Sequence, residues 1–190
     1  MVEAERRWLD LAALDVTLGT IDETADGSLL IRDPKVRAVS RGPAGDDAQL
    51  VFRYLGPTPQ EAPLASGQLR RQIGLKLRAL DSCNLLYVVW EVAPTPAIRI
   101  LRKTNPDASR HVDCGVDGYE ELAPPFTDLP PIEPRDGEHE LRAALHGTLL
   151  KVWADGALVF AGEIAAAADL HGPAGLRSDN GRFELHLGLR

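Results

Sequence analysis

Seven polar side chains in the middle of the chain have the types and spacing of a ligand-binding surface. Residues 69–78 alternate between apolar and polar side chains, which is typical of a strand with one buried and one solvated face. Residues 85–92 and 98–103 are also rich in strand-forming residues. If these segments are neighbours in one sheet, a single face carries a basic and aromatic set consisting of Gln72, Lys76, Arg78, Tyr87, Glu91, Arg99 and Lys103.

Such a set has the chemistry for recognising a sugar. Aromatic and hydrogen-bonding groups suit a carbohydrate, and the excess of cations favours a carboxylated or sulfated one. If the surface is catalytic instead, Glu91 is the candidate acid or base, working with a neighbouring tyrosine or histidine. The competing interpretation is a solvated sheet face with no ligand.

Metal chemistry has less support in the sequence. Asp113 and Asp117 lie in a glycine-containing acidic loop, but two carboxylates fall short of the roughly six oxygens that calcium needs. A turn rich in aspartate and glycine is the favoured interpretation. We therefore expect no metal and no cofactor, with calcium at this loop as the alternative.

The two cysteines, Cys83 and Cys114, are expected to be free thiols of a cytosolic chain, with Cys83 packed as a small buried residue. A bridge between them is the alternative and would contribute about 3 to 4 kcal/mol. His111 and the two thiols also form a candidate metal site or thiol–imidazole pair. No second C-x-x-C motif and no family signature supports either site.

Composition narrows the classes of protein and partner. The 190 residues, 44% of them hydrophobic and 26% charged, predict one soluble domain spanning 1–190, in which residues 1–20 are a possible short extension. No apolar run reaches the roughly 20 residues of a membrane span, so no membrane partner is expected. The net charge of −7 disfavours nucleic acid. The charged start of the chain predicts a cytoplasmic protein, unless a native leader is missing.

Short strands and turns dominate the pattern along the chain. Asp155-Gly156 between two apolar runs indicates a two-residue hairpin, and five prolines in 122–137 indicate a stiff crossover. The alanine-rich stretch 163–170 predicts a helical turn, and the start of the chain carries a weak helical stripe. We also expect Trp90 and Trp153 in the core and a turn formed by Asp179 and Asn180. Together these features predict an all-β, two-sheet antiparallel sandwich of about a dozen strands, with at most one or two short helices.

The last third of the chain resembles a known superfamily. V-W-A-D-G-A-L-V-F-A-G followed by G-P-A-G-L-R-S-D-N-G-R-F-E-L-H-L is similar to the closing strands of concanavalin A-like lectin/glucanase jelly rolls, especially laminin G-like modules. D-G-S-L-L-I-R and G-L-K-L-R-A-L-D-S-C-N-L-L-Y-V-V-W resemble their opening and central strands, so the likeness spans about 26–189. It implies a convex back sheet and a concave front sheet that commonly binds glycans.

The first functional hypothesis is therefore a module that binds a carbohydrate or a small polar or anionic ligand on its concave sheet. A glycoside hydrolase, a lyase or a small-molecule tailoring enzyme using the same groove is the alternative, and a protein-interaction domain is the third. The sequence leaves open which of these holds, and with it the ligand and the oligomeric state.

Overall fold

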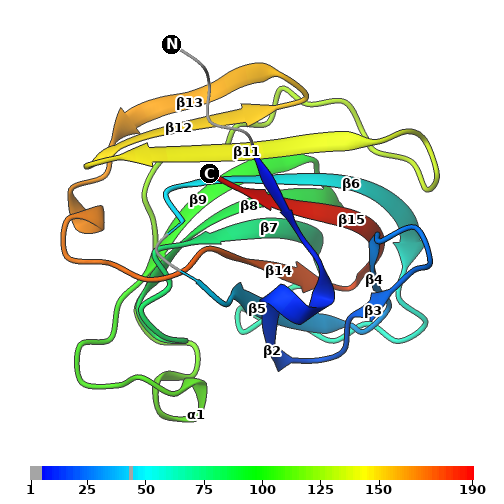
Figure 1. The fold of residues 1–190 in the computed structure, drawn as a ribbon. Coiled ribbons are helices and arrows are strands. Elements are labelled where there is room, and N and C mark those ends of the chain that lie inside the picture. Colours follow the sequence, from blue (N-terminus) through cyan, green and yellow to red (C-terminus); the bar gives the residue numbers. More distant parts are fainter. Residues whose placement is uncertain (1–5, 43–44) are drawn as a thin grey trace.

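The computed structural model describes residues 6–42 and 45–190, which form two antiparallel sheets packed face to face (Figure 1). Fifteen strands lie within the described residues, together with one four-residue α-helix and two 3-10 turns. This confirms the predicted all-β sandwich. None of the described helices is long and apolar enough to cross a membrane.

The two sheets interleave segments that are distant in the sequence. The back sheet has the order β13-β12-β11-β6-β15-β4-β3. In addition, β1 pairs with residues 187–189 of β15, beyond the part that pairs with β4. The front sheet has the order β10-β9-β8-β7-β14-β5-β2. The back strands are β1 (Arg7–Leu9), β3 (Asp22–Glu23), β4 (Leu29–Ile31), β6 (Asp47–Pro57), β11 (His139–His146), β12 (Leu149–Ala154), β13 (Ala157–Glu163) and β15 (Gly181–Leu189). The front strands are β2 (Leu14–Leu18), β5 (Lys35–Ser40), β7 (Arg71–Leu77), β8 (Leu85–Ala93), β9 (Ala97–Lys103), β10 (Tyr119–Glu121) and β14 (Gly175–Asp179).

The core fills the space between the sheets and follows the period-two pattern of the strands. Alternate residues of the front strands point inward, and Trp90 on β8 meets Phe52 of β6 edge to face at 5.5 Å between ring centres. Phe52 makes a similar contact with Phe183 of β15 at 5.9 Å. The prediction that Trp153 belongs to the core is wrong. This ring is half-buried on the outer face of the back sheet, where the guanidinium carbon of Arg142 lies 4.8 Å from its centre.

Local turn chemistry is confirmed where the sequence signal was strongest. Asp155 and Gly156 both have positive φ, +48° and +77°, as a type I′ turn between β12 and β13 requires. The proline-rich segment 122–137 leads from β10 in the front sheet to β11 in the back sheet, and its only assigned pairing is the bridge between Ile98 and Phe126. The alanine-rich stretch contains the 3-10 turn Ala165–Ala167.

The helical interpretation of residues 2–14 is wrong from Arg6 onward, and residues 2–5 lie outside the described part of the chain. From Arg7 the chain pairs with β15 as β1, makes the 3-10 turn Leu11–Ala13, and continues as β2 against β5. Asp10 caps the turn by accepting a hydrogen bond from the Ala13 amide at 2.9 Å. Leu9 and Leu14 reach the core from either side of this turn. Burial in two sheets outweighs a weak local helix preference.

Candidate ligand-binding groove

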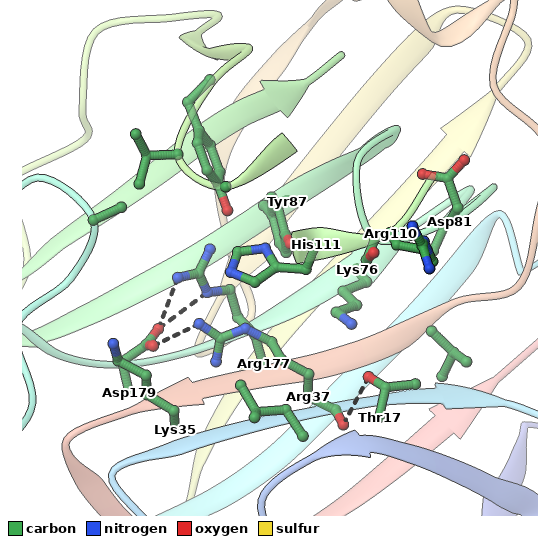
Figure 2. A pocket seen from close by; sticks show the side chains of 18 of the residues that line it. Thr17, Lys35, Arg37, Lys76, Asp81, Tyr87, Arg110, His111, Arg177 and Asp179 are labelled. Atoms are coloured by element: carbon green, nitrogen blue, oxygen red, sulfur yellow. Dashed lines mark hydrogen bonds and ion pairs between the residues drawn. The ribbon is translucent and has the colours of Figure 1, made fainter. Parts of the chain in front are cut away.

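A groove of about 850 Å³ opens on the outer face of the front sheet. Its floor comes from the paired strands β5, β14, β7 and β8, and β2 contributes at one side. Loop residues 63–65 and 79–82 and the segment around helix α1 (His111–Cys114) form the walls. Figure 2 shows that strand and loop side chains converge on this hollow.

Strand register sets the arrangement of the floor. Lys76 lies opposite Tyr87 on one neighbouring strand and opposite Gly175 on the other. In the next row along the strands, Arg177 lies opposite Gly74. A Cβ atom at Gly175 would lie 2.1 Å from the Ala38 carbonyl oxygen, so the position admits only glycine. A Cβ atom at Gly74 would likewise lie 2.5 Å from the Val88 carbonyl oxygen, so neither position has room for a side chain.

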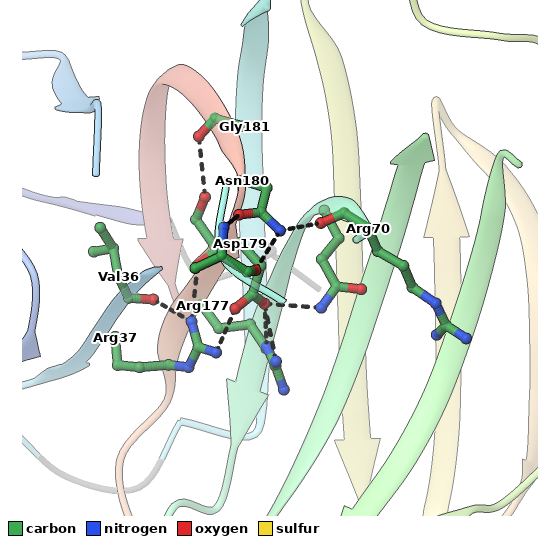
Figure 3. Close-up of polar contacts among 10 residues, drawn as sticks. Val36, Arg37, Arg70, Arg177, Asp179, Asn180 and Gly181 are labelled. Carbon is green, nitrogen blue, oxygen red and sulfur yellow. Dashed lines mark hydrogen bonds and ion pairs between the residues drawn. The ribbon is translucent and has the colours of Figure 1, made fainter. Parts of the chain in front are cut away.

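A buried carboxylate holds the two arginines of the floor in place (Figure 3). Asp179 accepts from Arg37 at 2.6 Å and from Arg177 at 2.9 and 3.0 Å, and its side chain is fully buried. Gln72 donates a further hydrogen bond at 2.8 Å. Burial by itself would raise the pKa of Asp179, but the two guanidiniums and Gln72 outweigh it and hold the pKa well below its ordinary value.

Arg177 also connects the ion cluster to an aromatic pair. Its guanidinium carbon lies 4.7 Å from the ring centre of Tyr87. Tyr87 in turn stacks on Tyr119 of β10, with ring centres 6.1 Å apart and planes inclined by 23°. Burial raises the pKa of Tyr87, so its hydroxyl stays protonated. Tyr119 is partly exposed and lines the groove, and the Nζ of Lys103 lies 5.1 Å from its ring centre.

Lys76 is a buried residue whose amine has no counterion among the described residues. Only 4% of the residue is exposed, and no hydrogen bond or ion pair joins its Nζ to any other described residue. Burial and the nearby positive charges of Arg37 and Arg177 lower the pKa of Lys76 to about 7. The three cations of the floor face the single carboxylate of Asp179, so the floor is positive and suited to an anion.

A disulfide between Cys83 and Cys114 fixes one wall of the groove. The expectation of free thiols is therefore wrong, and so are the thiol–imidazole and zinc hypotheses that needed them. The short helix α1 brings Cys114 over the start of β8 and places His111 at the groove. Lys103 lies beneath this wall and donates to the Gly115 carbonyl at 2.8 Å.

The structure places the seven predicted residues in several environments. Alternation and register put all except Arg78 on the outer face of the front sheet, but only Lys76 and Tyr87 line the groove. Gln72 supports Asp179, and Lys103 supports the disulfide wall. Glu91 is buried and pairs with Arg99 at 2.9 Å and with Arg70 at 3.6 Å, outside the groove.

Arg78 does not belong to the predicted surface. β7 ends at Leu77, and Arg78 has a φ of +47°, which interrupts the strand alternation. Its guanidinium binds Asp46 at 2.8 and 3.0 Å and the Ala167 carbonyl at 2.7 Å. Arg78 thus connects the segments that contain Asp46 and Ala167. Its left-handed backbone turns the side chain away from the face that strand periodicity assigns to it.

Sequence reasoning missed Arg37, Arg177 and Asp179, which define the floor with Lys76. The interpretation of Asp179 as a turn former is corrected, because it ends β14 as a paired, fully buried strand residue. Asn180 does adopt the predicted left-handed conformation, with φ +59°. Its side chain also bonds the backbone of Ala62 and Arg70. The only sequence signal for the arginines was their alternation with apolar residues in 35–40 and 175–179.

The acidic loop offers little for a metal. Asp113 forms an ion pair with Arg110 at 2.9 Å. Within the described part of the chain, no three His, Cys, Asp or Glu side chains gather as a metal site would require.

Comparisons with known proteins identify the class of fold. No family model and no curated protein sequence matches the chain. Among solved structures, the carbohydrate binding module CBM66 from Bacillus subtilis matches with a TM-score of 0.64 and 14% identity over 91% of each chain. The Crh5 transglycosylase in complex with NAG matches with a TM-score of 0.58 and 14% identity over 98% of this chain and 84% of its own. The carbohydrate recognition domain of Emp46p matches with a TM-score of 0.54 and 12% identity over 96% of this chain and 87% of its own. The fold is therefore the jelly roll of concanavalin A-like lectins and glucanases, as the sequence resemblance implied.

Proposed function

We propose that this protein is a carbohydrate-binding module whose front-sheet groove takes a sugar carrying a carboxylate or sulfate. The observation that carries the proposal is the buried Lys76, which has no hydrogen-bond or ion-pair partner among the described residues, in a groove that also holds Arg37 and Arg177. A buried cation without a counterion costs folding free energy. An anionic ligand would supply the missing partner.

The shape and lining of the groove support a sugar as the carrier of that charge. A volume of about 850 Å³ lies within the usual range of small-molecule sites. Tyr119 offers a partly exposed ring on which a sugar face can stack, next to the hydroxyl-bearing Tyr87. Three matching folds are named for carbohydrate binding, carbohydrate recognition and transglycosylation, which supports the same class of ligand.

The hydrogen bonds made by the carboxylates of the groove favour sugar binding over glycoside hydrolysis. Among its described lining residues these are Asp81 and Asp179. Asp179 is held by two arginines, and Asp81 accepts from the Cys83 amide at 2.7 Å and from Asn84 at 3.0 Å. Both carboxylates are thus already engaged within the protein, whereas a glycosidase needs two carboxyl groups that act on the scissile bond.

A glycan array that contains neutral, uronate-bearing and sulfated oligosaccharides tests the proposal, followed by calorimetry on the best probe. We expect binding to acidic glycans and at least a tenfold loss in Lys76→Met. Lys151→Met, in β12 of the back sheet, is the matched control and should bind like the wild type. If no glycan binds, or if Lys76→Met binds acidic glycans as well as Lys151→Met does, the proposal is wrong.

A further inference from the structure

Recognition of an anion uses only the positive charge of Lys76. The amine of Lys76 can also act as a nucleophile. The chain has four lysines, at positions 35, 76, 103 and 151. Lys103 donates to the Gly115 carbonyl, and Lys151 lies in the back sheet. Lys35 and Lys76 line the groove, but Lys35 is half-buried whereas Lys76 is buried on the floor. Lys76 alone combines access to the groove with burial and a free Nζ among the described residues.

An amine attacks a carbonyl carbon only in its neutral form, which ordinary lysines rarely adopt near pH 7. Burial and the two neighbouring guanidiniums lower the pKa of Lys76 to about 7, so a large fraction of the amine is neutral at physiological pH. This matches the environment of lysines that form Schiff bases.

The neighbours of Lys76 also select the kind of carbonyl compound. Arg37 and Arg177 share the single carboxylate of Asp179, so the cluster keeps one net positive charge beside the lysine. A small molecule that carries both a carboxylate and a carbonyl group fits this pairing of a cationic cluster with a neutral amine.

We propose that Lys76 forms an imine with the carbonyl carbon of a small oxo acid, such as a 2-oxo acid or the open-chain form of an acidic sugar, while Arg37 and Arg177 attract its carboxylate. A bond forms between Nζ and the carbonyl carbon, and the carbon–oxygen bond breaks. The oxygen leaves as water with the two hydrogens of the neutral amine, so no oxidant or reductant is needed. Hydrolysis reverses the step. This reactivity shares the groove with the proposed carbohydrate binding but does not depend on it.

Reductive trapping tests this inference on the intact protein. Glyoxylate is added with cyanoborohydride at neutral pH, and the reduced adduct is located by peptide mass spectrometry. We expect the adduct on Lys76 to form at least tenfold faster than on Lys35 or Lys151. Acetaldehyde, which has no carboxylate, should label Lys76 at least fivefold more slowly than glyoxylate does.

Variants and outcomes separate this inference from the proposed function. Lys76→Arg should lose the adduct, and Lys151→Arg, in β12 of the back sheet, should keep it. Mapping on the wild type decides the matter even if Lys76→Arg does not fold. Labelling of Lys76 no faster than Lys151, or equal labelling by acetaldehyde, overturns the inference. Glycan binding without an adduct overturns the imine alone, and an adduct without glycan binding overturns the carbohydrate proposal alone.

Discussion

Arg177 donates two hydrogen bonds to Asp179 while its guanidinium lies over the ring of Tyr87, so one buried side chain joins the ion cluster of the groove to its aromatic pair. The arginine is held from both sides, and its position does not depend on a bound ligand. Such preorganisation lowers the conformational entropy that the protein loses when a ligand binds.

Replacing Asp179 by asparagine should destabilise the protein by about 3–5 kcal/mol, because Arg37 and Arg177 would stay buried without their anion. Urea unfolding at pH 7 measures the change. Asp113→Asn, which breaks an exposed pair with Arg110, is the control and should cost at most about 1 kcal/mol. The folded-state pKa of Asp179 is depressed, so its contribution is complete above the unfolded value near 4 and is lost as pH falls below it. A difference between variant and wild type that does not shrink below pH 4 contradicts this account.

Lys76→Met should stabilise the protein at pH 6 by about 1–3 kcal/mol while removing the site for acidic ligands. The folded-state pKa of Lys76 is about 7, below its ordinary value of 10.5. Between these values the unfolded chain binds a proton that the native protein does not, so wild-type stability rises with pH. The advantage of the variant should therefore be largest below pH 7 and shrink towards pH 10. Denaturant unfolding of the wild type and Lys76→Met at pH 6 and pH 9 measures this difference in stability. A difference at pH 9 that equals or exceeds the one at pH 6 would contradict the claim that burial of a charged Lys76 destabilises the protein.

Affinity for an acidic glycan should fall by about tenfold as pH rises from 6 to 8, since Lys76 loses its charge in this range. His111 also lines the groove, but burial and the nearby cations Lys103, Arg37, Lys35 and Arg177 lower its pKa, so its charge adds only at lower pH. Calorimetry on the wild type and His111→Gln distinguishes the two groups. Persistence of the pH 6–8 loss in His111→Gln assigns it to Lys76, whereas its disappearance assigns it to the histidine.

The double variant Cys83→Ser, Cys114→Ser should be less stable by about 2–4 kcal/mol, because the bridge closes a loop of 31 residues in sequence separation. Binding should weaken by a few fold, since helix α1 and His111 lose their covalent attachment to the sheet. Wild type treated with a thiol reductant should reproduce both effects. Thermal unfolding and calorimetry measure them, and an unchanged melting temperature would show that the bridge does not secure this wall.

Arg99→Ala should leave glycan affinity within about twofold of the wild type, because Arg99 and its partner Glu91 lie outside the groove. Stability should drop by about 3 kcal/mol or more, since the buried Glu91 keeps only its longer contact with Arg70. Calorimetry combined with urea unfolding separates the two effects. A large loss of affinity in a folded Arg99→Ala would show that the binding surface also includes the ion pairs of Glu91 with Arg99 and Arg70.

The sequence by itself determined the sheets and the face on which the site lies. Alternation in 69–78 depends only on the two-residue period of a strand, so it placed Lys76 on the outer face. Tyr87 was added from the adjacent predicted strand 85–92, and the two residues lie opposite each other and line the groove. The Asp155-Gly156 turn is similarly local, because positive φ is a property of the residues themselves. Arg78 departs from the pattern because its own backbone turns left-handed after the strand ends.

The tertiary structure alone decided which polar residues form the groove. Arg37 and Asp179 meet although 142 positions separate them, because β14 pairs between β5 and β7. Strand order is set by the packing of the whole sandwich, and no local pattern encodes it. The bridge between Cys83 and Cys114 likewise depends on where the loop after β9 folds back. The sequence could therefore place a charge on a face. Only the pairing of distant strands showed which charges neutralise each other and that Lys76 has no partner among the described residues.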